Sequence, residues 1–389
     1  MKARQVTVIQ EKDGVTLTLP DGTSRFFHYV WLRMCCRCDV CGHGYEGTLT
    51  LQPCDVPLDI QPVKVRCSDG KLDIAWSTDR HESQYDVSWL FRNAYAKEDR
   101  EYRKHRPTLW NREIFNTVPA VDYQAVREDD EHYMTFLRSL RDYGFVIVRD
   151  GPQDIGSGET MAGLLGEIAE STYGRLFDLN PSSNNVTFGN TMNTVPPHTD
   201  EAYLHSPPGI NVLHCLRPAN KAGESVLVDG FHLAEQLRLH DPQHFEVLTT
   251  IPQSYHRIVQ DLGIYHNIRG TVIKLDSDDD VVGFRYHTRT AAPLDVPTED
   301  VIRVHAANAE LSRRMLEDDN QACFKLQSGE AVFFDNHRVM HARKAFSDPH
   351  RHMQISAVSR AQFHRKLRMT AYKLGYRDEA EQLLASGAG

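Results

Sequence analysis

The first 91 residues show short runs of alternating apolar and polar residues separated by Asp-Gly turns. An alternation with a period of two is typical of half-buried strands, and an Asp-Gly pair between two such runs is typical of a hairpin. The pattern therefore predicts a small β domain over residues 1–91. Its expected strands lie in VTLTL (15–19), RFFHYVWL (25–32), KVRC (64–67) and LDIAW (72–76).

Residues 92–118 interrupt this pattern, because they are mostly polar and carry no strand signal. We expect them to form a helical or irregular connector to a second domain over 119–389. Two stretches near the start of that domain have the period of an amphipathic helix. The first, 129–144, can be capped by Asp129 or Asp130. The apolar stripes are Tyr133, Phe136, Leu137 and Leu140 in 129–144, and Met161, Leu164, Leu165 and Ile168 in 159–172.

Short strand-like runs dominate residues 186–360, with helices expected only near 233–240 and 299–317. A segment near the end, 365–386, has the pattern of an amphipathic helix that can contact a partner or pack on its own domain. Many short strands with a few flanking helices indicate a jelly roll or barrel of the cupin type. The predicted fold class is mostly β with flanking helices, a double-stranded β-helix (jelly roll) domain after a small β domain.

Chain length, net charge and the distribution of apolar residues argue against several classes of function. A chain of 389 residues is long enough for two domains. The formal net charge of −9 argues against nucleic acid or an anionic membrane surface as the main partner. No apolar run approaches the roughly 20 residues of a membrane span. The start, MKARQVTVIQ, lacks the apolar core of a signal peptide, so we expect a cytoplasmic protein.

The chain contains eight cysteines, which we do not expect to form disulfides in a reducing compartment. Cys36, Cys38 and Cys41 are close enough in sequence for three thiolates to bind one zinc ion. A structural zinc site needs four ligands. The spacing leaves the fourth ligand open among Cys35, His43, Cys54, Cys67 and His81, and the alternative is a set of buried apolar thiols.

His198 and Asp200 are separated by one residue, so on a strand their side chains point the same way. With a distant histidine they can form the two-histidine, one-carboxylate set that holds iron(II). The segment from 330 to 358 offers several candidates for that third ligand: His337, His341, His350 and His352. Arg351 lies on an otherwise apolar strand face and is a candidate receptor for a carboxylate.

With these candidate ligands, the chain resembles the γ-butyrobetaine and trimethyllysine dioxygenases, which depend on iron(II), 2-oxoglutarate and O2. The resemblance covers nearly the whole chain. It rests on the segments WLRMCCRCDVC, DRHESQYDVSWL, STYGRLF, NNVTF, HTDEAYLHSPPGINVLHC, LVDGF, FFDNHRVMHAR and RHMQ. It implies zinc on Cys36, Cys38, Cys41 and His81, iron on His198, Asp200 and His341, the distal carboxylate of 2-oxoglutarate on Arg351, and a homodimer.

The resemblance also implies a small-molecule substrate with a trimethylammonium head, which aromatic faces can hold. The aligned aromatic residues are Tyr173, Phe177, Phe188 and Tyr203, although core packing is the alternative for each of them alone. The γ-butyrobetaine enzymes carry a cage tyrosine six residues after the 2-oxoglutarate arginine, where this chain has Ala357. Asn185 is a further substrate-binding residue implied by the resemblance.

The acid end of the substrate is predicted from GFRYHTR (283–289). Alternation would place Arg285, His287 and Arg289 on one face. The alternative is a solvated outer face. A cationic cluster favours a substrate with more negative charge, and the resemblance includes a dioxygenase of 2-(trimethylamino)ethylphosphonate, so this compound ranks first, slightly ahead of γ-butyrobetaine. Trimethyllysine ranks third, because a cationic cluster would repel its additional amine. A hypothesis of another class is a non-catalytic β-helix protein that binds quaternary amines.

Overall fold

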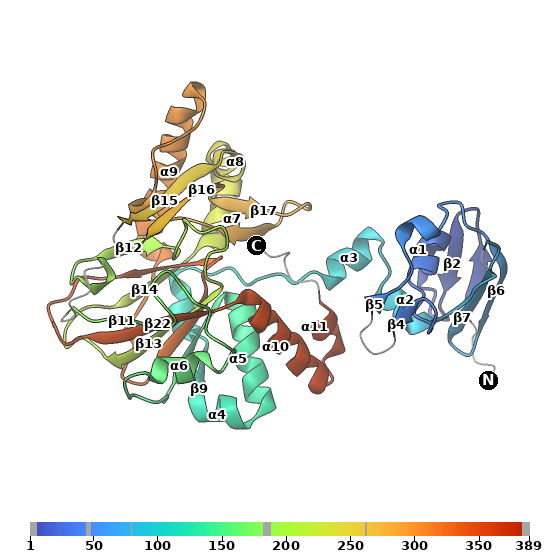
Figure 1. The fold of residues 1–389 in the computed structure, drawn as a ribbon, viewed down its shortest axis with the longest axis horizontal. Helices are drawn as coiled ribbons and strands as arrows, with labels where there is room; N and C mark the ends of the chain where they lie inside the picture. Colours follow the sequence, from blue (N-terminus) through green and yellow to red (C-terminus); the bar gives the residue numbers. More distant parts are fainter. Residues whose placement is uncertain (1–5, 44–47, 79, 182–187, 261–262, 383–389) are drawn as a thin grey trace. The chain divides into compact units, whose positions relative to one another are not determined.

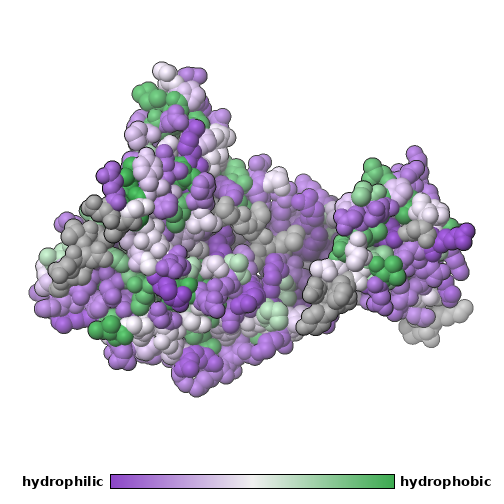
Figure 2. Space-filling model, viewed as in Figure 1, coloured by the Kyte–Doolittle hydropathy of each residue, from purple (hydrophilic) through white to green (hydrophobic). Residues whose placement is uncertain are grey.

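The computed structural model describes residues 6–43, 48–78, 80–181, 188–260 and 263–382. The chain divides into two compact units, Met1–Lys104 and His105–Gly389 (Figure 1). This boundary falls inside the predicted connector 92–118. No helix in the described parts of the chain has the length and apolar character needed to cross a membrane. On the face shown in Figure 2, apolar residues form small patches between larger hydrophilic areas.

The first unit contains two three-stranded antiparallel sheets, which agrees with the predicted short strands and hairpins. In the β6–β7 hairpin, Asp69 (φ 53°) and Gly70 (φ 76°) both have positive φ, which is the conformation that an Asp-Gly pair favours in a two-residue turn. The described strands and helices of this unit are β1 (Thr7–Gln10), β2 (Gly14–Thr18), β3 (Ser24–His28), α1 (Tyr29–Met34), β4 (Gly42–His43), β5 (Thr48–Leu49), β6 (Pro62–Ser68), β7 (Lys71–Trp76), β8 (Glu82–Asp86), α2 (Val87–Arg92) and α3 (Lys97–Arg103).

One predicted strand of this unit is only half correct. Residues 25–28 belong to β3, but the chain then turns into α1. Tyr29, Leu32 and Arg33 are buried at a spacing of three to four residues, so they form one face of a helix. The apolar run RFFHYVWL fits both the strand period of two and the helix period of 3.6. Packing of Tyr29 and Leu32 into the core of this unit favours the helix in its second half.

The second unit is built on two facing β-sheets. The six-stranded sheet has the order β11-β22-β13-β20-β10-β9, and the four-stranded sheet has the order β12-β21-β14-β19. Apolar side chains from both sheets, among them Phe145, Leu213, Leu227 and Val339, share one core. The strands are β9 (Ala120–Asp122), β10 (Phe145–Arg149), β11 (Phe177–Leu179), β12 (Val195–His198), β13 (Ile210–Arg217), β14 (Ser225–Asp229), β19 (Ala322–Phe324), β20 (Ala331–Asp335), β21 (Val339–Arg343) and β22 (His352–Val358).

Helices cover the outer faces of both sheets. Helices α5 (Asp130–Tyr143) and α10 (Arg360–Lys373) pack on the six-stranded sheet, with α4 (Tyr123–Glu128) beside α5. The four-stranded sheet packs against α7 (Gly230–His240), α8 (Pro242–Thr250) and α9 (Val301–Leu316). Figure 1 shows these three helices close to the hairpin of β15 (Gln253–Val259) and β16 (Ile264–Gly270). A second short hairpin joins β17 (Ile273–Leu275) to β18 (Val281–Phe284). The two packed sheets confirm the jelly-roll prediction.

The helix predicted at 129–144 is confirmed as α5. Asp129 caps it by accepting a hydrogen bond from the His132 backbone N–H, and Gly144 ends it with φ 76°. The second predicted helix, 159–172, is wrong beyond its first turns, because α6 spans only Ser157–Ala162. Gly166 has φ 154°, which a helix does not accept, and Ile168 forms a β-bridge with Val358.

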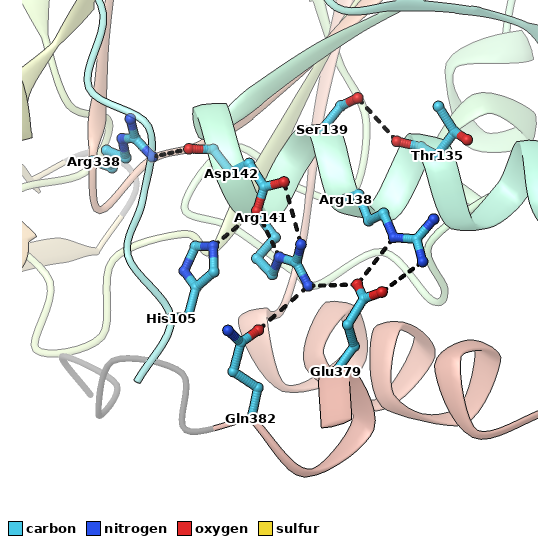
Figure 3. Close-up of polar contacts among 9 residues, drawn as sticks. All are labelled: His105, Thr135, Arg138, Ser139, Arg141, Asp142, Arg338, Glu379 and Gln382. Atoms are coloured by element: carbon cyan, nitrogen blue, oxygen red, sulfur yellow. Dashed lines mark hydrogen bonds and ion pairs between the residues drawn. The ribbon is translucent and has the colours of Figure 1, made fainter. Parts of the chain in front are cut away.

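The predicted helix 365–386 is also divided. Gly375, with φ 83°, separates α10 from α11 (Arg377–Glu381). Phe363 and Leu367 of α10 are buried against α5, so this segment packs on its own unit. Figure 3 shows how α11 is attached: Arg138 and Arg141 of α5 both donate hydrogen bonds to the Glu379 carboxylate.

Candidate active site

Sheet pairing brings a distant histidine to the His198–Asp200 pair. His198 is the last residue of β12, and Asp200 follows in the adjoining turn. Strand β12 pairs antiparallel with β21, and His198 lies directly opposite His341. The Asp200 carboxylate lies 3.4 Å from His198 Nε2 and 3.6 Å from His341 Nε2. One ligand atom from each of these residues lies within 4.8 Å of the others, as a single metal ion requires.

Neighbouring groups set the charges and orientation of this trio. Burial opposes ionisation of Asp200, but the adjacent His341 and His198 rings outweigh it and hold the pKa of Asp200 well below its usual range. Burial lowers the pKa of His341 to about 3. The His341 ring is therefore neutral near pH 7, and two imidazoles with one carboxylate form a donor set suited to iron(II). The Asn211 side chain orients the carboxylate by donating to it at 2.8 Å.

The other histidines proposed as the third ligand have different surroundings. His337 Nε2 lies 3.2 Å from the Pro207 carbonyl oxygen, and His352 Nε2 lies 2.6 Å from the Asp178 carboxylate. His350 is exposed in the loop before β22. Only His341 joins His198 and Asp200 in a group of possible ligands within the described parts of the chain.

The trio opens into a cavity of about 240 Å³. Arg351 is 4% exposed and lines the same cavity, with its guanidinium 5.2 Å from the Phe346 ring centroid. Among the described residues no carboxylate pairs with Arg351, and burial lowers its pKa to about 10. A buried cation without an anion is costly, so this position suits an anionic ligand such as the carboxylate of 2-oxoglutarate.

A second group of possible metal ligands lies in the first unit. The sulfur atoms of Cys36, Cys38 and Cys41 each lie 3.4 Å from His81 Nε2. The thiols come from the turns that follow α1, and His81 comes from the β7–β8 connection. Arg33 donates a hydrogen bond of 3.1 Å to the Cys41 sulfur from within the core. Three thiolates and one imidazole form the donor set of a structural zinc site, and one cation beside them offsets part of their charge.

Two parts of the sequence match models of known protein families. Residues 87–356 match the model described as taurine catabolism dioxygenase TauD, TfdA family. The chain belongs to the TauD/TfdA dioxygenase family. Residues 6–91 match the model described as gamma-butyrobetaine hydroxylase-like, N-terminal. As a member of this family, the protein is a dioxygenase that uses iron(II), 2-oxoglutarate and O2, which agrees with the donor set around Asp200.

Individual relatives are similar over most of their length. The mitochondrial trimethyllysine dioxygenase of Bos taurus is 32% identical over 87% of this chain and 81% of its own. The gamma-butyrobetaine dioxygenase of Pseudomonas sp. (strain AK-1) is 32% identical over 89% of this chain and 91% of its own. The human gamma-butyrobetaine dioxygenase is 27% identical over 84% of this chain and 85% of its own.

All four aromatic residues expected to hold the substrate head line the cavity of this family member. Tyr173 and Phe177 lie with ring centroids 5.3 Å apart, and Tyr203 stacks on His266 at 5.6 Å. Phe188 differs, because the Arg289 guanidinium lies 4.6 Å from its ring centroid and occupies one of its faces. Within the described parts of the chain, no lysine or arginine lies over the rings of Tyr173, Phe177 and Tyr203.

The predicted cationic face is only partly formed in the structure. Strand β18 ends at Phe284, so alternation does not continue through Arg289. Arg285 lies outside the cavity lining and donates to the Ala202 and Leu204 carbonyl oxygens, which corrects the prediction for this residue. His287 lies 4.6 Å from the His198 ring, and burial lowers its pKa, so it is neutral. Arg289 does line the cavity. Asn185 lies outside the described residues.

Four charged residues of the cavity were missed in the sequence: Arg175, Glu201, Arg257 and Arg343. Arg257 comes from β15, a strand that the pattern did not single out, and its Nε has no partner among the described residues. Glu201 follows Asp200 directly, and burial raises its pKa. The alternation in β15 could have suggested an inward side for Arg257, but no local signal indicates that the hairpin reaches the cavity.

Proposed function

We propose that this dioxygenase hydroxylates an aliphatic carbon of a trimethylammonium compound that also carries an acidic group, with formation of succinate and CO2. One observation supports this proposal above the others. A single cavity contains the His198, Asp200 and His341 trio, the unpaired Arg351, and the aromatic residues Tyr173, Phe177 and Tyr203.

In this proposal His198, Asp200 and His341 hold iron(II). The bound iron supplies the oxidation chemistry together with 2-oxoglutarate and O2. The His198 Nδ1 lies 2.9 Å from the Pro196 carbonyl oxygen, which fixes the ring and leaves Nε2 for the ion. Arg351 binds the distal carboxylate of 2-oxoglutarate through charge-assisted hydrogen bonds. The apolar lining, which includes Leu213 and Ile355, limits water around these polar groups.

The trimethylammonium head binds against Tyr173, Phe177 and Tyr203, because a cation without N–H donors is held by aromatic faces. Arg289 and Arg257 receive the acidic end. The relatives named trimethyllysine and gamma-butyrobetaine dioxygenase make those two compounds the first substrates to test. The charge argument against the additional amine of trimethyllysine now rests on Arg257 and Arg289, because Arg285 does not line the cavity.

A second candidate substrate is 2-(trimethylamino)ethylphosphonate. Its support is the presence of two arginines, Arg257 and Arg289, that have no carboxylate partner among the described residues of the cavity. A phosphonate resembles a phosphate ester, which carries roughly −1.5 to −2 charges near neutrality and therefore suits two cations.

Succinate formation from each of the three compounds, with iron(II) and O2 present, tests the proposal. We expect at least one trimethylammonium compound to be turned over. Arg289→Asn should lower kcat/KM for the phosphonate more than for γ-butyrobetaine, because it removes one of two cations. Turnover of none of the three compounds would contradict the substrate class but would leave the dioxygenase assignment intact. We also keep the homodimer as a prediction, to be tested by light scattering.

A further inference from the structure

Glu201 places a carboxylate in the cavity wall, one residue after Asp200. The residue is 5% exposed and lines the cavity. Its Oε1 accepts a hydrogen bond from the Thr172 backbone N–H at 3.2 Å and lies 3.5 Å from the Tyr203 hydroxyl. Its Oε2 is buried and has no partner among the described residues. Glu201 therefore contacts both segments that carry the tyrosines of the proposed head site, the 171–174 turn and residue 203.

The backbone of Glu201 is in a conformation that few residues of its type adopt. Its φ is 48°, in the left-handed region. Such conformations cost free energy in residues other than glycine and persist where the surroundings enforce them, often at functional sites. Here the turn directs the Asp200 carboxylate toward the two histidines while Glu201 lies beside Tyr203. The strain thus accompanies the placement of two adjacent carboxylates at two different positions in one cavity.

The cavity contains unpaired charges of both signs. Arg175, Arg257 and Arg289 also line it, yet none of them forms an ion pair with Glu201 among the described residues. A buried carboxylate is costly unless it meets a cation. Positive and negative groups that share a cavity without pairing are complementary to a ligand that carries separate charges of both signs.

We propose that Glu201 determines the selectivity of this enzyme for the positive charge of the trimethylammonium head, and that it holds Tyr173 and Tyr203 around that head. This inference rests on the proposed function. The head cannot donate a hydrogen bond, so the carboxylate acts on it through charge rather than through a direct contact. Such an interaction is stronger in a buried cavity than in water, because the effective dielectric constant is lower.

Two pairs of ligands isolate the charge of the head. The first pair is γ-butyrobetaine and 5,5-dimethylhexanoate, in which carbon replaces the quaternary nitrogen. The second pair is trimethyllysine and 2-amino-7,7-dimethyloctanoate, which both retain the α-ammonium group. Dissociation constants are measured by calorimetry without O2, on enzyme loaded with iron(II) and 2-oxoglutarate. The ratio of the two constants within a pair reports the preference for the cationic head, and binding of the neutral member shows that the cavity is intact.

Glu201→Gln removes the charge and keeps an oxygen that can accept from Thr172. We expect it to reduce the preference for the cationic head about tenfold in whichever pair the wild-type enzyme binds, with little change for the neutral member. Glu201→Asp keeps the charge and should retain most of the preference. Glu170→Gln, at an exposed position outside the cavity lining, is the control for net charge and should leave the ratio unchanged.

Three results would overturn the inference. One is a ratio in Glu201→Gln within about twofold of the wild-type ratio. Another is an equal loss of affinity for both members of a pair, which would indicate only a structural role. The third is a loss confined to the two amino acids, which would assign Glu201 to the α-ammonium group. If the wild-type enzyme binds no trimethylammonium compound, the proposed function fails first, and that result is separate from all three.

Discussion

At the scale of the residue, two arginines beside the same aromatic ring have different roles. Arg343 and Arg351 lie 4.8 and 5.2 Å from the Phe346 ring centroid. Arg343 donates to the carbonyl oxygens of Gly189, Thr191 and Asn193, so its hydrogen bonds hold the chain around residues 189–193. Arg351 has no such acceptor among the described residues. Both arginines are buried, so burial does not distinguish them. The lack of an acceptor identifies Arg351, rather than Arg343, as the residue suited to bind an anionic ligand.

Arg351→Gln should raise the concentration of 2-oxoglutarate needed for half-maximal succinate formation by about tenfold or more. A hydrogen bond to a charged group contributes roughly 1.5–3 kcal/mol, and a factor of ten corresponds to about 1.4 kcal/mol. The substrate concentration needed should change much less. Arg149→Gln, at an exposed arginine outside the cavity, should match the wild type. An unchanged 2-oxoglutarate requirement in Arg351→Gln would refute the assignment.

His341→Ala should lose tight iron(II) binding and retain the fold, because it removes one of three ligands and leaves the pairing of β12 with β21 intact. Equilibrium dialysis against iron(II) under nitrogen measures the loss, and circular dichroism checks the fold. His350→Ala changes an exposed histidine in the neighbouring loop and should bind iron normally. Iron binding that depends on His350 instead would show that the ligand assignment is wrong.

At the scale of the element, ion pairs attach α11 to α5. Arg138 and Arg141 of α5 donate to the Glu379 carboxylate of α11 (Figure 3). Asp142 of α5 lies 2.8 Å from His105 Nε2. The hydrogen bonds from Arg138, followed by those from Arg141, lower the pKa of Glu379 against the opposing effect of burial. The short helix α11 has no fully buried residue, but Ala380 packs against the core and its carbonyl oxygen accepts a hydrogen bond from Arg368 of α10, so these ion pairs are one of several attachments in the described structure.

Glu379→Gln should lower the free energy of unfolding of the second unit by about 1 kcal/mol at pH 7, the upper range for partly exposed ion pairs. The folded pKa lies below the unfolded value, so the ionised carboxylate stabilises the fold above the unfolded pKa of about 4.3. This contribution is lost as the pH falls through the folded pKa. Urea unfolding at pH 7 and pH 3 should show a difference between the two proteins that shrinks at low pH. Asp378→Asn, at an exposed position of α11, is the control.

At the scale of the whole molecule, the chain combines a catalytic unit with a unit that has its own core. The first unit has buried residues on both sheets and on its helices, including Leu17, Leu32, Leu72 and Trp76. The Cys36, Cys38, Cys41 and His81 group lies in this unit, and the His198, Asp200 and His341 group lies in the other. Loss of zinc should therefore affect folding of the first unit without directly removing an iron ligand.

Purified protein should contain one zinc ion per chain in addition to the iron, measured by mass spectrometry of the metals. Cys38→Ser should release the zinc and lower the unfolding temperature of the first unit, because a structural ion contributes folding free energy. Differential scanning calorimetry can follow the two units as separate transitions. Cys54→Ser changes an exposed cysteine outside the group and should keep the zinc. Native protein without zinc would refute the predicted ligand set.

The sequence by itself determined the features that depend on neighbouring residues. The Asp-Gly hairpin between β6 and β7 and the Asp129 cap of α5 follow from local turn and capping preferences. The sequence also paired His198 with Asp200, but β12 ends at His198, so the turn after the strand, rather than strand alternation, places the Asp200 carboxylate. The resemblance to known dioxygenases supplied His341 and His81, which spacing alone left among several candidates, whereas Arg351 was indicated by its position on an apolar strand face. The second helix failed because its apolar stripe did not reveal that Gly166 breaks the helix and Ile168 pairs with Val358.

Only the tertiary structure decided which distant residues share the cavity. The register of β12 against β21 places His341 opposite His198, and the end of β18 at Phe284 turns Arg285 away from Arg289. The β15–β16 hairpin brings Arg257 to the same cavity. These placements depend on the register and packing of segments far apart in the chain. A shift of one residue reverses the face of every side chain, and no local pattern specifies such a shift.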